Sequence, residues 1–334
     1  MKNKSYKIFN LITLTIIILI FIGVILFQNS ENFKSNKKNK VVIILHTEKS
    51  YAFANKICSS INVDCKKTTT TELKNTITKL KNKNIIVHPR TATPFDTDWI
   101  NYLKKLENNN VKVINPPRLL QLTSNKLECS FVLYNSGINH PKTWEGKKDK
   151  KTVLLILKLL KKHKYLIIKP SNSISQGAYV EKLNQKMNFS EVHNKIKNIP
   201  SDPFVIQEYI DYVSLYRVIV INGKALPYSF IDKPTKDNWK VSVCLNKTRM
   251  KFVANPPKKL LKLGEKTQRV LNNYIKSPYK GIHFIDIFET RNKQFTISEI
   301  NTACSLFIHE KLAKDAGHPD WEISKHIANY FNNL

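Results

Sequence analysis

The sequence predicts a mixed α/β and α+β protein, built from several subdomains and preceded by a transmembrane helix. Three observations support this prediction. Strands and helices alternate over residues 40–117, two apolar strands form a hairpin over residues 281–301, and residues 8–27 carry no charge. The length of 334 residues exceeds one average domain, so we expect two or three packed subdomains.

The apolar segment at residues 8–27, IFNLITLTIIILIFIGVILF, has about the length that crosses a bilayer as a helix. A cleaved signal peptide is the alternative, but no small-residue cleavage site follows the segment. Lysines flank it on both sides, so the positive-inside rule does not orient it. We therefore expect a single-pass membrane protein with a short tail, 1–7, and a flexible lysine-rich linker, 28–39.

The formal net charge of +30 comes almost entirely from lysine, in a sequence that is also rich in asparagine and isoleucine. We attribute this bias to overall composition, because the chain has no nucleic-acid-binding motif or repeat. Nucleic acid is therefore not an expected partner. The positive charge still favours anionic ligands.

The cysteines are odd in number and none forms a C-x-x-C pair. They are Cys58, Cys65, Cys129, Cys244 and Cys304. This distribution argues against a disulfide scaffold or a zinc site. We expect buried thiols in a reduced compartment.

Residues 40–117 alternate between β-type and helical stretches. Strands are expected at 40–46, 84–90 and 111–115, with helices at 51–60 and 96–109. This order predicts a small parallel sheet covered by helices. Arg90 follows the second strand, where such sheets bind ligands, and is a candidate for holding an anionic substrate. An exposed surface arginine is the alternative.

The hairpin brings oxygen ligands together. Its strands are residues 282–288 and 295–301, and alternation places Ile297, Glu299 and Asn301 on one face with Asp286 nearly opposite. Two carboxylates and an amide oxygen suit Mg²⁺, or Mn²⁺. The alternative is a pair of solvated carboxylates on an edge hairpin.

Two basic residues interrupt apolar strands between these regions. Lys169 lies in the strand 165–170 and Arg217 in the strand 214–223. A buried cation is costly unless it meets an anion, so contact with a phosphate explains both positions. Further strands are expected at 204–211 and 224–233, and further helices at 153–163, 260–274 and 318–331.

The ordered series of motifs resembles the ATP-grasp superfamily, as found in ribosomal-protein glutamate ligases and in inositol polyphosphate kinases. The resemblance begins in Asn115–Thr143 and ends with Asp286 and the Glu-x-Asn of Glu299 and Asn301. It implies three subdomains, with ATP between the central and C-terminal ones. The implied boundaries are 40–117 for a leading domain, 118–205 for the central subdomain and 206–334 for the C-terminal subdomain.

The resemblance also implies roles for individual residues. Lys126 and Lys169 would reach the ATP phosphates, and Arg217 would stabilise the oxyanion. Ser175, Gln176 and Gly177 would lie in a loop that covers the phosphates, and Gln207, Glu208 and Tyr209 would surround adenine. Asp286, Glu299 and Asn301 would bind the metal. Arg90, Lys233 and Lys240 would lie near the substrate.

The chain departs from the family pattern in three places. Relatives usually continue Glu-x-Asn with a small residue and Pro-Gly, whereas Thr302-Ala-Cys-Ser305 follows here. The phosphate-covering loop has Gly177 where relatives often have three glycines. Leu215 stands where relatives often carry an acidic residue.

The resemblance implies an ATP- and Mg²⁺-dependent carboxylate–amine ligase that acts through an acylphosphate on small-molecule or peptide substrates. An inositol polyphosphate kinase of the same fold is the alternative. The third possibility is a catalytically silent, membrane-tethered nucleotide-binding module. Because an enzyme that uses ATP needs the cytosol, we expect the catalytic body to be cytoplasmic.

Overall fold

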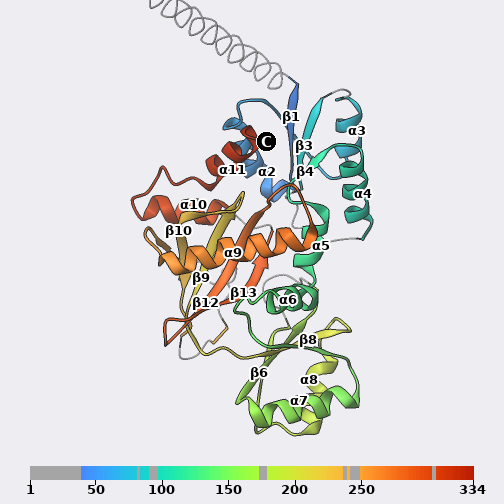
Figure 1. Ribbon diagram of the computed structural model, residues 1–334, viewed down its shortest axis with the longest axis vertical. Helices are drawn as coiled ribbons and strands as arrows, with labels where there is room; N and C mark the ends of the chain where they lie inside the picture. Colours follow the sequence, from blue (N-terminus) through green and yellow to red (C-terminus); the bar gives the residue numbers. More distant parts are fainter. Residues whose placement is uncertain are drawn as a thin grey trace, which may run out of the picture.

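Three sheets stacked along one axis form the described part of the computed structural model, which covers residues 39–80, 83–89, 97–172, 179–235, 239–240, 249–302 and 306–334. Figure 1 shows the N-terminal sheet at one end, the central subdomain at the other, and between them the sheet that contains β9 (Tyr212–Ile221), β12 (Ile282–Thr290) and β13 (Phe295–Asn301). The long helix α9 (Lys258–Ile275) lies across this middle sheet.

The N-terminal sheet is parallel, in the order β2-β1-β3-β4. Its strands are β1 (Lys40–Leu45), β2 (Asp64–Thr68), β3 (Asn84–His88) and β4 (Lys112–Val113). All six residues of β1 are buried, because helices cover both faces of the sheet. The helices are η1 (Glu48–Ser50), α2 (Tyr51–Ser59), α3 (Leu73–Thr78) and α4 (Thr97–Asn108). The predicted parallel sheet is therefore present, with β2 and α3 as elements that the sequence did not indicate.

The central sheet is antiparallel, in the order β5-β8-β6-β7. Its strands are β5 (Thr143–Gly146), β6 (Tyr165–Pro170), β7 (Glu181–Asn184) and β8 (Phe204–Glu208). Helices α7 (Lys150–Lys162) and α8 (Phe189–Lys197) pack on one face, where they bury Leu166, Ile168 and Leu183. Alternation therefore leaves Lys169 and Gln207 on the opposite face.

The middle sheet is antiparallel, in the order β11-β10-β9-β12-β13. Its strands are β9 (Tyr212–Ile221), β10 (Lys224–Asp232), β11 (Lys251–Val253), β12 (Ile282–Thr290) and β13 (Phe295–Asn301). One face packs on α5 (Pro117–Ser124), α6 (Lys126–Asn135) and α9. The other packs on α2, α10 (Leu306–Asp315) and α11 (Ile323–Asn332), which join it to the N-terminal sheet.

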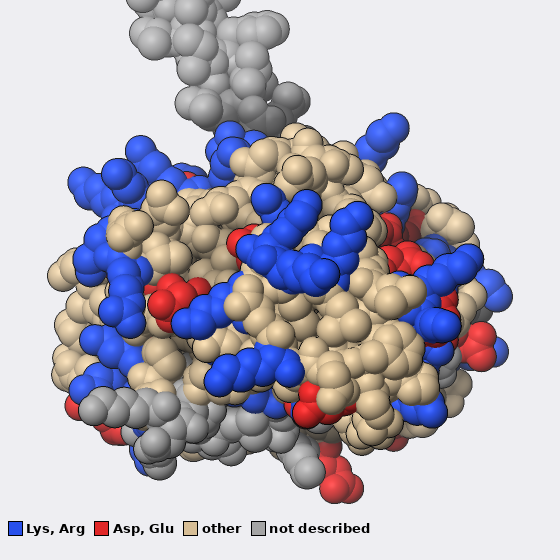
Figure 2. All heavy atoms as spheres, turned by 90° about the horizontal axis from the view of Figure 1, so that it is seen from below, with Lys and Arg blue, Asp and Glu red and all other residues tan. Residues whose placement is uncertain are grey.

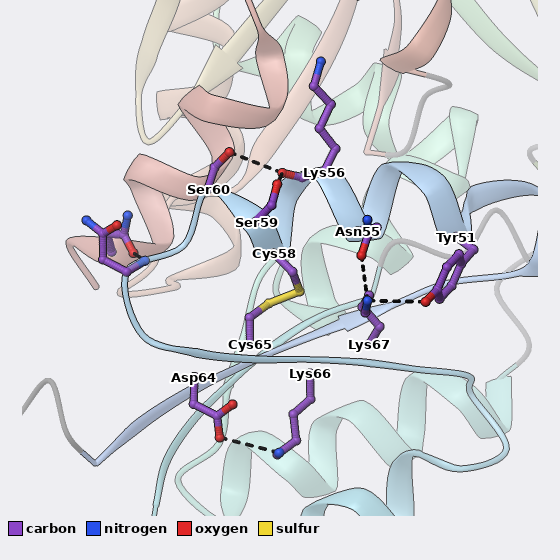
Figure 3. Close-up of a disulfide and its surroundings, with 12 residues drawn as sticks. Tyr51, Asn55, Lys56, Cys58, Ser59, Ser60, Asp64, Cys65, Lys66 and Lys67 are labelled. Atoms are coloured by element: carbon purple, nitrogen blue, oxygen red, sulfur yellow. Dashed lines mark hydrogen bonds and ion pairs between the residues drawn. A yellow bond between two sulfur atoms is a disulfide. The ribbon is translucent and has the colours of Figure 1, made fainter.

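A disulfide joins Cys58, in α2, to Cys65, in β2 (Figure 3). The expectation that the cysteines form no disulfide is therefore wrong. The two residues are seven apart in sequence, but the turn between helix and strand brings their Cα atoms to 5.4 Å, within disulfide range. Cys129 is a free, buried thiol as expected, while Cys244 and Cys304 lie outside the described residues.

The expected single-pass membrane location with a cytoplasmic body is also corrected. None of the helices in the described ranges is long and apolar enough to cross a membrane. The longest of them, α9, has 18 residues and carries charges along its length. Residues 1–38, which include the tail, the apolar segment 8–27 and all but the last residue of the linker 28–39, lie outside the described residues.

The surface reflects the composition. In Figure 2, which views the molecule from the end formed by the central subdomain, Lys and Arg cover far more area than Asp and Glu. The excess of positive charge is distributed over the face rather than confined to one patch.

Candidate active site

The β12–β13 hairpin carries the predicted metal ligands, and a β-bulge sets their direction. Asp286 pairs with Glu299, and the next pair is Ile287 with Ile297, so Ser298 has no partner in the register. The bulge lets Ile297 stay in the core beneath α9 while Glu299 points to the opposite face. The expectation that Ile297 shares a face with Glu299 is therefore wrong, whereas the facing of Asp286 and Glu299 is as expected.

Asp286 forms a two-pronged ion pair with Arg217 of β9. Arg217 Nε donates to Asp286 Oδ1 and Nη2 donates to Oδ2, both at 2.8 Å. The two side chains are 5% and 9% exposed, so each charge is buried against the other. Burial raises the pKa of Asp286, although Arg217 lowers it, and the nearby Glu299 raises it further.

Asn301 adds a third ligand type beside this pair. Its Nδ2 lies 3.4 Å from Asp286 Oδ2 and donates to it, which leaves the amide oxygen of Asn301 as the atom offered to a cation. The oxygens of Asp286, Glu299 and Asn301 are hard donors of the kind that Mg²⁺ prefers. The donor set therefore fits a magnesium ion that retains water or phosphate ligands.

Glu299 contacts the first of the two predicted phosphate lysines. Its Oε1 lies 3.3 Å from Lys126 Nζ, and the Glu299 side chain is 38% exposed. Burial raises the pKa of Glu299, but the charges of Lys126 and Lys169 outweigh this effect and hold it below the usual value. Glu299 is therefore an ionised, accessible carboxylate.

Local structure fixes Lys126 at the start of α6. The side chain of Asn125 caps the helix by accepting from the backbone N–H groups of Leu127 and Glu128, each at 3.2 Å. The backbone N–H of Lys126 donates to Ser171 O at 2.8 Å, at the end of β6. The helix start is thereby joined to the central sheet.

Lys169 lies on the face of the central sheet that is opposite α7 and α8. Its Nζ donates to Gln207 Oε1 at 2.9 Å, and Gln207 Nε2 donates to Thr143 Oγ1 at 2.9 Å. Burial lowers the pKa of Lys169 to about 8; Lys126 also lowers it, while Glu299 raises it. Lys169, Lys126 and Glu299 thus form one electrostatically coupled group.

The segment expected to hold adenine follows β8. Glu208 pairs with His163, whose Nδ1 is 3.6 Å from Glu208 Oε1. Tyr209, with Tyr165 and Trp239, surrounds the ammonium of Lys182, which lies 3.6 Å from the centre of the Tyr209 ring. Burial lowers the pKa of Lys182.

Among the described residues, Lys233 and Lys240 are not brought into this group. Lys233 is exposed, and Lys240 Nζ donates to Val180 O at 3.4 Å beside β7. Arg90 and the loop residues Ser175, Gln176 and Gly177 lie outside the described residues.

Two buried polar residues near the site were missed in the sequence. Asn115 Nδ2 donates to Ile282 O at 2.9 Å and Thr302 O at 3.2 Å, so one side chain ties the start of β12 to the end of β13. Asp232 is a buried carboxylate at the end of β10. An acid in an apolar strand was a signal for Asp232, whereas the role of Asn115 depends on contacts 167 and 187 residues away.

Comparisons with known proteins bear on the fold of the chain. Residues 145–270 match the family described as the ATP-grasp domain of prokaryotic glutathione synthetase. No curated protein matches the sequence of the chain.

Solved structures with a similar fold include a D-cycloserine synthetase, with a TM-score of 0.66 and 9% identity over 88% of this chain and 99% of that one. A RiPP-associated ATP-grasp ligase from Chryseobacterium gregarium, in complex with ADP and a leader and core peptide, has a TM-score of 0.63 and 14% identity, covering 89% and 96%. The D-alanine–D-alanine ligase from Bacillus anthracis has a TM-score of 0.59 and 18% identity, covering 89% and 96%. The chain therefore has the ATP-grasp fold, and its resemblance to the ATP-grasp superfamily is confirmed.

Proposed function

We propose that the protein is an ATP- and Mg²⁺-dependent ligase that joins a carboxylate to an amine. The observation that carries this proposal is the meeting of three oxygen-ligand side chains with two lysines at one place. Asp286, Glu299 and Asn301 come from the middle sheet, Lys126 from α6 and Lys169 from the central sheet. Carboxylates for a metal beside cations for phosphates suit the handling of a nucleoside triphosphate.

In the proposed reaction, a substrate carboxylate oxygen attacks the γ-phosphorus of ATP, and ADP leaves. An amine then attacks the acyl carbon of the acylphosphate, phosphate leaves and the nitrogen loses a proton. Mg²⁺, when bound, neutralises charge on the β- and γ-phosphates. Lys126 and Lys169 bind and orient those phosphates, because both ammonium groups lie beside Glu299 on the same side of the site.

Arg217 is proposed to act in two ways. Its two-pronged contact holds Asp286 in a single orientation. Its charge also lies next to the metal ligands, where it can offset negative charge on the oxyanion of the second step. Arg217→Lys keeps the positive charge but cannot make the two-pronged contact with Asp286. The variant therefore distinguishes the positioning role of Arg217 from the role of its charge.

We also propose that Gln207, Glu208 and Tyr209 contact the adenine of the nucleotide and that Ser175, Gln176 and Gly177 contact its phosphates. Lys233, Lys240 and Arg90 remain candidates for substrate contacts. The division into subdomains at 40–117, 118–205 and 206–334 also stays a prediction.

The ligase is preferred to the kinase because the similar structures named above are called a synthetase or a ligase, and one of the ligases is in complex with ADP and a leader and core peptide. No contact in the described residues favours an inositol phosphate in particular. The test is the product balance: a ligase releases ADP and free phosphate together, and only when both a carboxylate and an amine are present. A kinase would release ADP without free phosphate.

A further inference from the structure

Asp232 lies on the same sheet face as the candidate metal ligands. Phe230, two residues before it, pairs with Arg217, which in turn pairs with Asp286. Strands are about 4.8 Å apart and rise about 3.3 Å per residue, which puts the Cα atoms of Asp232 and Asp286 about 12 Å apart. That separation is comparable with the combined length of a metal ion, a phosphoryl group and a short substrate side chain.

Asp232 and its neighbour Arg249 have polar atoms with no partner. Asp232 Oδ1 accepts from the backbone N–H of Lys233 at 2.7 Å and lies 3.8 Å from Arg249 Nε. Asp232 Oδ2 and Arg249 Nη2 are both buried and have no hydrogen-bond partner in the described part of the chain.

Such atoms are rare in native proteins, because burial removes water without replacing its hydrogen bonds. Asp232 is 1% exposed, and burial raises its pKa even though the Lys233 N–H and Arg249 lower it. Arg249 is 29% exposed, so the pair borders on solvent. The orphaned atoms are one acceptor with negative charge and one donor with positive charge. A ligand that carries both an ammonium and a carboxylate satisfies both.

We propose that Asp232 and Arg249 form a subsite for the α-ammonium and α-carboxylate of a free acidic amino acid, whose side-chain carboxylate is the group activated by ATP. The ammonium donates to Asp232 Oδ2, and the α-carboxylate accepts from Arg249 Nη2. The side chain then extends along the sheet face toward Asp286. This inference rests on the proposed ligase function and specifies its carboxylate substrate.

The test uses the full-length protein with ATP, Mg²⁺, a pool of amines and three forms of glutamate or aspartate. The forms are the free amino acid, its Nα-acetyl derivative and its α-carboxamide. The wild-type protein should prefer the free amino acid over each derivative by about tenfold or more in kcat/KM. Asp232→Asn should abolish the preference over the acetyl form only, and Arg249→Gln the preference over the carboxamide only, with KM for ATP unchanged.

Asp211 and Arg291 provide matched controls, because they form an exposed ion pair at 3.7 Å. Asp211→Asn and Arg291→Gln should keep both preferences. If Asp232→Asn does not fold, Arg249→Gln alone still tests the carboxylate contact. Turnover with preferences that neither variant changes, or turnover that favours other carboxylates, overturns the subsite and leaves the ligase intact. Absence of ADP and phosphate release with every carboxylate–amine pair overturns the ligase itself.

Discussion

Glu299 is the residue where the metal and phosphate halves of the candidate site meet, because it faces Asp286 across the hairpin and contacts Lys126. Glu299→Gln keeps the shape and removes the charge. We expect kcat to fall by at least about a hundredfold, the usual cost of one preorganised electrostatic group. The melting temperature should change little, because the side chain is 38% exposed.

Glu181 offers a matched control for this variant. It pairs with Lys195 at 2.8 Å and is 45% exposed. Glu181→Gln should keep wild-type turnover in the same ADP-release assay. Equal activity of the Glu299 and Glu181 variants would contradict the role given to Glu299.

Lys169 should set the alkaline limit of ATP use, because burial lowers its pKa to about 8. The ammonium is charged below that pH and neutral above it, so phosphate binding weakens as pH rises through about 8. We expect kcat/KM for ATP to fall over this range, since this ratio reports groups of the free enzyme. Lys169→Arg should move the fall to higher pH, because arginine stays charged. If kcat/KM for ATP falls over the same pH range in this variant, another group is responsible for the titration.

Single residues were predictable where a charge interrupts an apolar strand. Lys169 and Arg217 were found in this way, and both have buried polar partners. Asp232 also interrupts an apolar strand, but a charged partner was predicted only for the two basic residues. That the partner of Arg217 is Asp286 could not be predicted, because strand order and register decide which residues face each other across β9 and β12.

At the scale of elements, the hairpin was predictable and its bulge was not. Simple alternation gives Ile297 and Glu299 the same face. The extra residue, Ser298, reverses that relation and keeps Ile297 in the core. Bulges depend on how two strands pair, so the sequence of one strand does not reveal them.

Asn115 should act as a clamp on this hairpin. Asn115→Ala leaves buried backbone groups of Ile282 and Thr302 without their partner, at about 1–3 kcal/mol for each. We expect a lower melting temperature and a higher Mg²⁺ concentration for half-maximal turnover, because the ligands on β13 are held less firmly. Asn109→Ala, at an exposed position, is the control and should change neither value. A destabilised variant with an unchanged Mg²⁺ requirement would limit Asn115 to a structural role.

Gly281 gives an independent probe of the same clamp. A Cβ at this position would lie 2.5 Å from Asn115 Oδ1 and 2.8 Å from Leu119 Cδ2. Gly281→Ala should therefore raise the Mg²⁺ requirement in the same direction as Asn115→Ala.

The disulfide between Cys58 and Cys65 should stabilise the N-terminal sheet. Closing a loop this short is worth about 2.5 kcal/mol in the chain-entropy estimate. We expect a reductant to lower the melting temperature of the wild-type protein and to leave that of Cys58→Ser/Cys65→Ser unchanged. Equal effects of reductant on both proteins would show that the bond contributes nothing. Cysteine number and spacing could not predict the bond, because it depends on how the helix end meets the next strand.

At the scale of the whole molecule, the ordered series of motifs between Asn115 and Asn301 was enough to predict the ATP-grasp fold by resemblance. Similar structures share 9–18% of their residues with this chain, so the fold is carried by strand order and core pattern more than by identity. The predicted membrane location was wrong, because none of the helices in the described part of the chain is long and apolar enough to cross a membrane.

The stoichiometry of ATP turnover by the full-length protein tests the central claim most directly. ADP and inorganic phosphate are measured separately, with Mg²⁺, across carboxylate–amine pairs and inositol phosphates. The ligase predicts one phosphate for each ADP, and release only when a carboxylate and an amine are both present. ADP formed without free phosphate, together with a phosphorylated inositol, would contradict it.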